Sequence, residues 1–160
     1  MAQNVEVAEE PDRIEAVYRA ESPRLWRALL LHTGSREAAN DAVSEAFVQA
    51  IARGAEIRDP RAWIWKAAFR IAQGSKLPDQ ALSDETDDGV EPDLPDDLID
   101  LTRALAALSH HQRVAAVMHY YGGYPLAEIA EVLGSSRSAV GVHLFRARER
   151  LRREMGDRDE

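Results

Sequence analysis

The chain has 160 residues, no cysteine and a net charge of −8. This length suffices for one ordinary core or two small helical ones, and the lack of cysteine excludes disulfides and thiolate chemistry. The N-terminus is acidic without an apolar core, and no window approaches the length of a membrane span. We therefore expect a soluble, cytoplasmic protein with no membrane span.

The negative charge is confined to the middle of the chain. Residues 1–76 hold 11 basic and 11 acidic side chains, residues 77–100 hold 10 acidic and none basic, and residues 101–160 hold 9 basic and 7 acidic. The net charges are therefore 0, −10 and +2. Nucleic-acid binding needs Lys and Arg to neutralise phosphates, and the overall charge does not exclude it because one segment holds the acidic excess.

The acidic segment predicts a two-module organisation. It contains prolines and little periodic apolar sequence, so it cannot bury enough surface to offset its ordering entropy. We expect a helical domain at residues 11–76, an acidic flexible linker at 77–96, and a second helical domain at 97–154. Neither domain shows the alternation typical of β-strands, so the predicted fold class is all-α.

The first domain is predicted to contain four helices. Apolar residues at helical spacing predict one helix before Pro23 and another after it. The third helix begins at the N-cap Ser35 and ends at Gly54, and the fourth begins near Asp59 and Pro60. The apolar face of the third helix comprises Ala39, Val43, Ala46, Phe47 and Ala50.

One stripe of the fourth helix combines an aromatic side chain with two cations. At about 100° per residue, Trp63, Lys66 and Arg70 share a side apart from the apolar face. Such a surface suits unpaired bases and phosphates. Spacing alone favours the simpler interpretation, a solvated face with one half-buried tryptophan.

The second domain ends in two amphipathic helices joined by Gly134. Helices are predicted over residues 98–108 and 110–121, and a third over 126–133. Gly134 permits a sharp turn, and Ser135 or Ser136 caps the last helix, which buries Val140 and Leu144. This arrangement suits a helix-turn-helix unit whose second helix enters a major groove.

The last helix is rich in arginine, which suits contact with phosphates. Its cations are Arg137, Arg146, Arg148, Arg150, Arg152 and Arg153. The outer surface, with Gly141, Val142 and Phe145, offers few bidentate contacts to bases, so we expect modest sequence discrimination. The alternative is a solvated helix whose charge Glu149 and Glu154 partly cancel.

Two stretches resemble a known family. YPLAEIAEVLGSSRSAVGVHLFRARERLR resembles region 4 of the extracytoplasmic-function (ECF) sigma factors of bacterial RNA polymerase, and LAALSHHQRVAAVMHYYGGY is similar to the helices before it. REAANDAVSEAFVQAIARG and DPRAWIWKAAFRIAQ resemble region 2. The resemblance covers both domains in the family's order. It implies a sigma subunit that binds core polymerase, directs it to a promoter and helps to melt the start site.

The resemblance also implies residue roles. The helix with Asp41, Glu45 and Phe47 docks on the clamp helices of the β′ subunit. The minus-10 element contacts Trp63, Lys66, Arg70 and Lys76. The minus-35 element contacts Arg137, Ser138, His143, Arg146 and Arg148, and the same domain touches the β-flap. The acidic linker would run through a channel built for a polyanion, which suits its charge.

The sequence departs from the family pattern at several positions. Ser44 stands where a glutamine is common, and Arg70 replaces a usual asparagine. The basic helix that extends region 2 is cut short at Gly74, and residues 138–143 lack the polar run typical of the recognition helix. Docking to polymerase is therefore better supported than strong promoter recognition.

Two alternatives stay open. One is a sigma-like mimic that binds an anti-sigma factor or polymerase without initiating, and the other is a plain helix-turn-helix regulator. An anti-sigma factor is a further candidate partner, with exposed Val142 and Phe145 as its contact. The sequence leaves open whether the two domains pack together, although opposite charges and a short spacer favour it.

No enzyme chemistry is indicated. His110 and His111 diverge by about 100° on a helix, so both cannot face one ion together with His119. The sequence holds no phosphate-cradling glycine loop, no nucleophile with a base, and no paired catalytic carboxylates at a useful spacing. We expect neither a metal nor a cofactor, and no catalytic activity.

Overall fold

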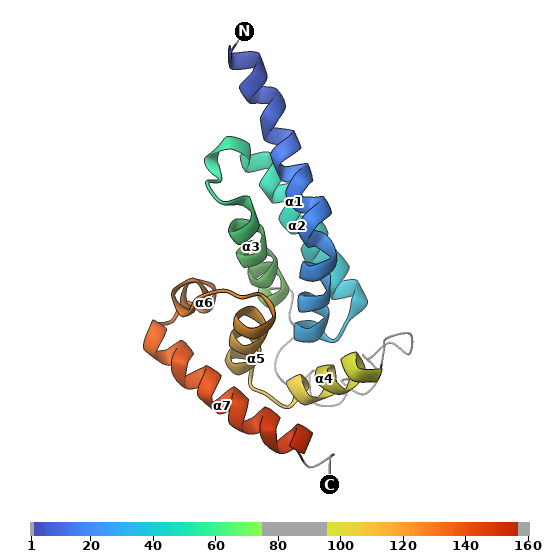
Figure 1. Ribbon diagram of the computed structural model, residues 1–160, viewed down its shortest axis with the longest axis vertical. Helices are drawn as coiled ribbons and strands as arrows, with labels where there is room; N and C mark the ends of the chain where they lie inside the picture. The colour runs from blue at the N-terminus through green and yellow to red at the C-terminus, as the bar shows by residue number, and fades with distance from the viewer. Residues whose placement is uncertain (1, 75–95, 157–160) are drawn as a thin grey trace.

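The computed structural model describes residues 2–74 and 96–156, which form helices and short connections with no strand among them (Figure 1). The predicted all-α fold is confirmed. The first module comprises α1 Ala2–Thr33, α2 Arg36–Arg53, the short helix η1 Gly54–Glu56 and α3 Pro60–Gly74. The second comprises α4 Asp96–Ala106, α5 His110–Ala116, the π-helical turn η3 Val117–Tyr121, α6 Leu126–Leu133 and α7 Arg137–Gly156. Lys76 and residues 77–95 of the predicted linker lie outside the described residues.

The predicted caps of the first module are present. The Ser35 hydroxyl accepts a hydrogen bond from the backbone N–H of Ala38 at 3.1 Å, and Gly54 ends α2 with a φ of 54°. A carboxylate oxygen of Asp59 accepts from the N–H of Ala62 at 3.2 Å. These contacts satisfy first-turn N–H groups that have no partner within their helix. Local sequence therefore determines where α2 and α3 begin.

The prediction of two helices flanking Pro23 is wrong, because α1 runs without interruption from Ala2 to Thr33. A proline inside a helix removes one backbone hydrogen bond and costs roughly 3 kcal/mol. Burial on both sides of it offsets that cost. Ile14 before the proline and Leu25 and Leu29 after it are all buried in the same core. Tertiary packing thus overrides the local breaking signal.

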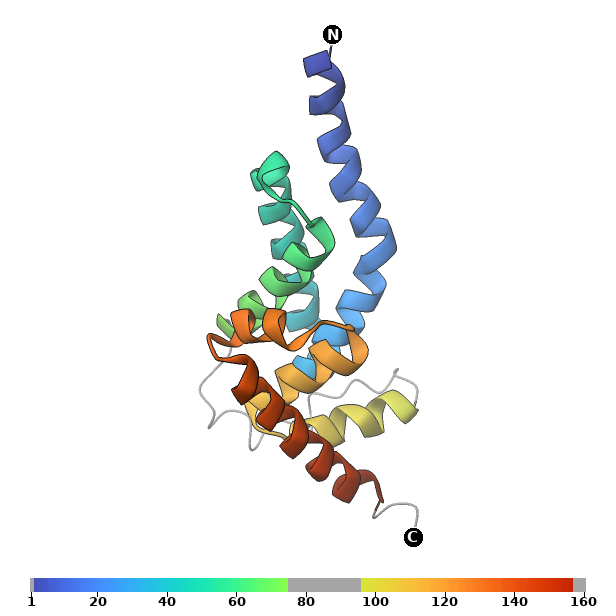
Figure 2. The ribbon, with the colours of Figure 1, turned by 60° about the vertical axis from the view of Figure 1, so that its left-hand side comes forward.

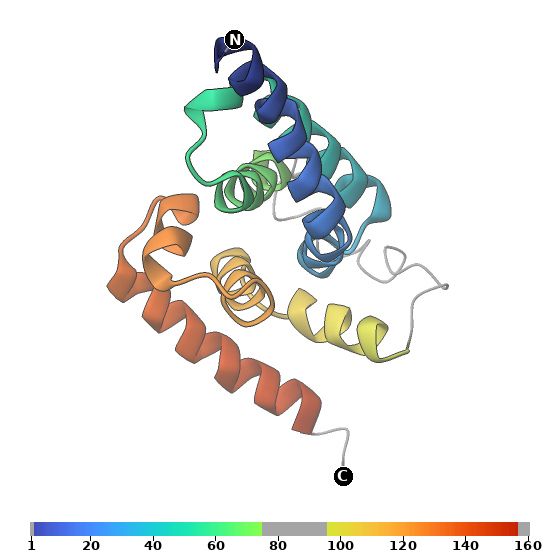
Figure 3. The same ribbon diagram turned by 45° about the horizontal axis from the view of Figure 1, so that its top comes forward.

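The two modules share one core. α1, α2 and α3 pack together, and the second module lies across the lower end of this bundle in Figures 1 and 2. α4 and η3 contact α1, and α6 contacts α3. Their buried apolar side chains form a single contiguous cluster. α7 lies on the far side of α5 from the first module (Figure 3), so its outer face points away from the shared core.

None of the helices in residues 2–74 and 96–156 combines the length and the apolar character that crossing a membrane requires.

Candidate polymerase and nucleic-acid interfaces

The helix-turn-helix unit predicted at Gly134 is present as α6 and α7. Gly134 adopts the left-handed conformation, with φ 62° and ψ 41°, which a residue without a Cβ atom reaches at no steric cost. The N–H of Ser135 bonds to the carbonyl of Ala130 at 2.9 Å. The hydroxyl of Ser136 accepts from the N–H of Ala139 at 3.1 Å, so Ser136 is the residue that caps α7.

The outer face of α7 is open to solvent. Val140, Leu144 and Ala147 are buried on the inner face, against α5 and α6. The opposite side exposes Ser138, Val142 and Phe145, the last with 57% of its surface accessible. Four of the five predicted minus-35 residues are exposed, namely Arg137, Ser138, Arg146 and Arg148. This face therefore presents cations around a small apolar patch.

His143, the fifth predicted minus-35 residue, lies differently. Its side chain is half-buried at the edge of the inner face, and its ring centroid lies 5.2 Å from that of His111 on α5. Burial lowers the pKa of His143, and the nearby His111 and Arg146 lower it further. The imidazole is therefore neutral at pH 7. His143 supports the packing of α7 on α5 more than it extends the outer face.

A titration of His143 is expected to show the effect of His111 on the pKa of His143. Because its pKa lies below 6.5 in the folded state, the unfolded chain binds the proton more readily. The resulting stability is present above the unfolded pKa and is lost as the pH falls through the folded pKa. NMR titration should give a pKa of His143 below 6.5 that rises in the variant His111→Gln. A pKa unchanged by that substitution would show that the two rings do not interact.

The predicted minus-10 stripe on α3 is divided between two environments. Trp63 is half-buried, and the guanidinium of Arg53 lies 5.8 Å from its ring centroid. Lys66 and Arg70 instead face α6 of the second module, where both bond to Glu131. Lys76 lies outside the described residues. Trp63, Lys66 and Arg70 therefore share one side of α3 as predicted. Lys66 and Arg70 contact Glu131 of the second module, whereas Trp63 is not bonded to it.

The predicted clamp-binding helix α2 exposes an apolar surface that sequence reasoning missed. Asp41 and Glu45 are exposed as expected, whereas Phe47 is buried and packs edge-on against Tyr18 at 4.9 Å between ring centroids. Val48 and Ile51 lie on the same side as the two carboxylates and are 59% and 65% exposed. The sequence does carry a signal for this surface, because Val48 and Ile51 lie outside the main apolar stripe of the helix.

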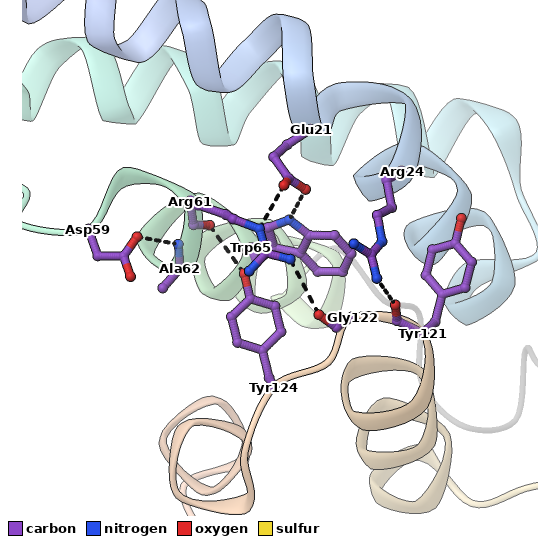
Figure 4. Close-up of polar contacts among 9 residues, drawn as sticks. All are labelled: Glu21, Arg24, Asp59, Arg61, Ala62, Trp65, Tyr121, Gly122 and Tyr124. Carbon is purple, nitrogen blue, oxygen red and sulfur yellow. Dashed lines mark hydrogen bonds and ion pairs between the residues drawn. The ribbon is translucent and has the colours of Figure 1, made fainter.

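A polar network joins the modules around Trp65 (Figure 4). Glu21 accepts hydrogen bonds from Arg61 at 2.6 Å and from the indole N–H of Trp65 at 3.1 Å. Arg61 also donates to the carbonyl of Gly122 at 3.5 Å, and its guanidinium lies 5.2 Å from the ring centroid of Tyr124. Burial raises the pKa of the Tyr124 hydroxyl, which keeps it protonated. The network holds the start of α6 against α3.

Close packing reinforces this contact. The Trp65 and Tyr124 rings lie 5.4 Å apart between centroids. A Cβ atom at Gly122 would come within 3.0 Å of the Trp65 ring and within 2.7 Å of a backbone oxygen. Arg24 donates to the carbonyl of Tyr121 at 2.6 Å. The sequence favours packing of the two modules on the basis of charge. The structure shows that this packing also depends on specific residues, among them Trp65, Tyr124 and Gly122.

Comparison with known proteins identifies the class. The family described as "Sigma-70, region 4" matches residues 98–151. The ECF RNA polymerase sigma factor SigL of Mycobacterium tuberculosis is 30% identical over an aligned length of 165 residues. The alignment covers 91% of this chain and 90% of that protein. This chain therefore belongs to the ECF RNA polymerase sigma factors.

Solved structures show the same fold. The sigma factor RpoE of Bartonella quintana, in complex with the anti-sigma factor NepR, has a TM-score of 0.71 and 21% sequence identity, covering 89% of this chain and 96% of that one. CnrH, in complex with the cytosolic domain of CnrY, has a TM-score of 0.71 and 20% identity, covering 98% and 96%. Both helical modules thus have counterparts of the same fold in these two structures.

Proposed function

We propose that the protein binds core RNA polymerase and directs promoter-specific transcription initiation, as a factor without catalytic activity of its own. The observation that carries this proposal is the relationship to a sigma factor over 91% of the chain, which spans both modules. The exposed outer faces of α2 and α7 supply two separate surfaces for polymerase and DNA. Such a factor works in the cytoplasm beside RNA polymerase.

The proposed binding roles are assigned to residues on three different surfaces of the molecule. The outer face of α2, with Asp41, Glu45, Val48 and Ile51, binds the β′ clamp helices, and Phe47 supports this helix from the core. On α7, Arg137, Ser138, Arg146 and Arg148 contact the minus-35 element, with His143 behind them. Trp63, Lys66, Arg70 and Lys76 serve the minus-10 element, and the second module touches the β-flap.

Run-off transcription tests the proposal. Purified protein is added to core polymerase on a library of genomic fragments, and transcripts are mapped. Transcripts that start at defined positions and require the protein are the expected result. Polymerase binding without any specific transcript would refute initiation and support a sigma-like mimic.

The mimic is the second candidate, and one observation favours it. Two of the described residues assigned to the minus-10 element, Lys66 and Arg70, are bonded to Glu131 of the second module. A chain held permanently in this form could bind polymerase while leaving minus-10 DNA unbound. A plain helix-turn-helix regulator explains α6 and α7 but gives the outer face of α2 no role.

An anti-sigma factor is a further partner under this proposal. RpoE of Bartonella quintana was solved with the anti-sigma factor NepR. In this chain, Val142 and Phe145 form an exposed apolar pair on α7, which suits the apolar side of a partner helix. Such a partner would compete with minus-35 DNA for the same face.

Substitution of Arg146 and Arg148 by alanine is expected to weaken DNA binding and its salt dependence. Two lost phosphate contacts reduce the slope of log K against log salt by about 2. Fluorescence anisotropy over a salt series, with a duplex promoter fragment, measures both quantities. The matched control replaces Arg27 and Arg103, two exposed cations on α1 and α4. If both double variants reduce the slope equally, α7 holds no special DNA contact.

A further inference from the structure

Lys66 and Arg70 converge on a single residue of the second module. The ammonium of Lys66 lies 3.0 Å from a carboxylate oxygen of Glu131. A guanidinium nitrogen of Arg70 donates to the backbone carbonyl of the same residue at 3.4 Å. Glu131 is 65 positions from Lys66 in the chain, so this contact is made only when the modules pack together.

The carboxylate of Glu131 offers Lys66 an oxygen acceptor that carries one negative charge, whereas Arg70 meets the neutral backbone carbonyl of the same residue. A backbone phosphate of DNA presents the same chemistry, with one negative charge spread over two free oxygens. Lys and Arg bind phosphate and carboxylate through equivalent charge-assisted hydrogen bonds. A phosphate could therefore replace Glu131 at Lys66 without any change in the chemistry of the cation.

We infer that the Glu131 side chain occupies, in the packed molecule, the place of a backbone phosphate of single-stranded DNA on Lys66, while the backbone carbonyl of Glu131 occupies Arg70. The inference rests on the proposed minus-10 role of these two cations. It makes the Glu131 carboxylate an internal competitor of DNA. Lys66 cannot pair fully with both acidic groups, so a phosphate at Lys66 has to displace this carboxylate.

The contact is suited to exchange. The side chain of Lys66 is 20% exposed and that of Glu131 is 60% exposed, so water already reaches the pair. Ion pairs this open are weak and screened by salt. The bonds around Arg61, Gly122 and Tyr124 hold α6 in place independently of Glu131. The Glu131 carboxylate thus reduces the affinity for DNA modestly without locking the site.

The test compares two neutral variants of α6 in the full-length protein. Binding of a fluorescein-labelled single-stranded oligodeoxynucleotide is measured by anisotropy at low and moderate salt. The variant Glu131→Gln is expected to bind about two- to five-fold more tightly than wild type. The control Glu128→Gln removes the same charge from the same helix, one turn earlier, and is expected to gain less than Glu131→Gln. The gain of Glu131→Gln should shrink as salt increases.

A double-mutant cycle assigns the effect to Lys66. In a Lys66→Gln background, Glu131→Gln is expected to gain no more DNA affinity than Glu128→Gln does, because its specific partner is gone. An equal gain with and without Lys66, an equal gain from Glu128→Gln, or no detectable binding by wild type and Glu131→Gln would each overturn the inference. Circular dichroism of each variant confirms that the helices are retained.

The proposed function is judged separately by run-off transcription. If wild type directs specific transcripts while Glu131→Gln binds DNA no better, only the competition by Glu131 is refuted. If neither protein directs transcripts with core polymerase, the proposed function fails whatever the anisotropy shows.

Discussion

Replacing Val48 and Ile51 of α2 with serine is expected to abolish most transcription directed by the protein while leaving its fold intact. Both side chains are more than half exposed, so neither contributes much to the core. Burial of an aliphatic side chain contributes about 1.5–3 kcal/mol, and each 1.4 kcal/mol is tenfold in affinity. Because about three-fifths of each side chain remains to be buried, the double variant should bind core polymerase at least roughly tenfold more weakly.

A polymerase pull-down and a titration of run-off transcription measure this effect. Tyr120→Ser is the matched control, because Tyr120 is a 53% exposed aromatic residue on η3 of the second module. Its substitution should leave polymerase affinity near that of wild type. Wild-type affinity in the α2 double variant would remove this face from the polymerase interface, and equal losses in both would indicate a non-specific effect.

Replacing Trp65 with alanine is expected to destabilise the protein by about 3–5 kcal/mol. Trp65 is fully buried and lies between the modules. Its ring stacks on Phe69 at 6.3 Å and contacts Tyr124 at 5.4 Å between centroids. Truncation leaves a cavity and removes the hydrogen bond that the indole N–H of Trp65 donates to Glu21. Urea denaturation followed by far-ultraviolet circular dichroism gives the free energy of unfolding.

Trp63→Ala provides a control on the same helix. Trp63 is only half-buried, so its truncation should cost about 1 kcal/mol or less. Its effect should appear instead in the affinity for single-stranded DNA, because base stacking contributes about 1–3 kcal/mol. Equal destabilisation by both substitutions would contradict the central position of Trp65.

Much of the fold could be predicted because its signals are local. The caps at Ser35 and Ser136 and the turn at Gly134 lie within three or four residues of the groups they satisfy. The outer face of α7 was predicted for the same reason, since the helical period alone separates Val142 and Phe145 from the buried stripe. Such features need no knowledge of distant parts of the chain.

The candidate sites were predicted less completely. Periodicity placed Phe47 on an apolar face but could not show that Tyr18 would cover it. It could not predict that α2 leaves Val48 and Ile51 open, since that depends on which helices pack beside it. His143 looked like one more polar residue of a recognition helix until its contact with His111 was known.

The helical segments, most of their ends, the separation of charge and the relationship to sigma factors could all be predicted from the sequence. Three features could not: α1 continues through Pro23, the modules share a core, and Glu131 contacts Lys66. The two groups differ in the distance along the chain over which the responsible interactions act. Helix caps and turns depend on neighbours in the chain, whereas these three outcomes depend on burial and ion pairing between groups brought together by folding.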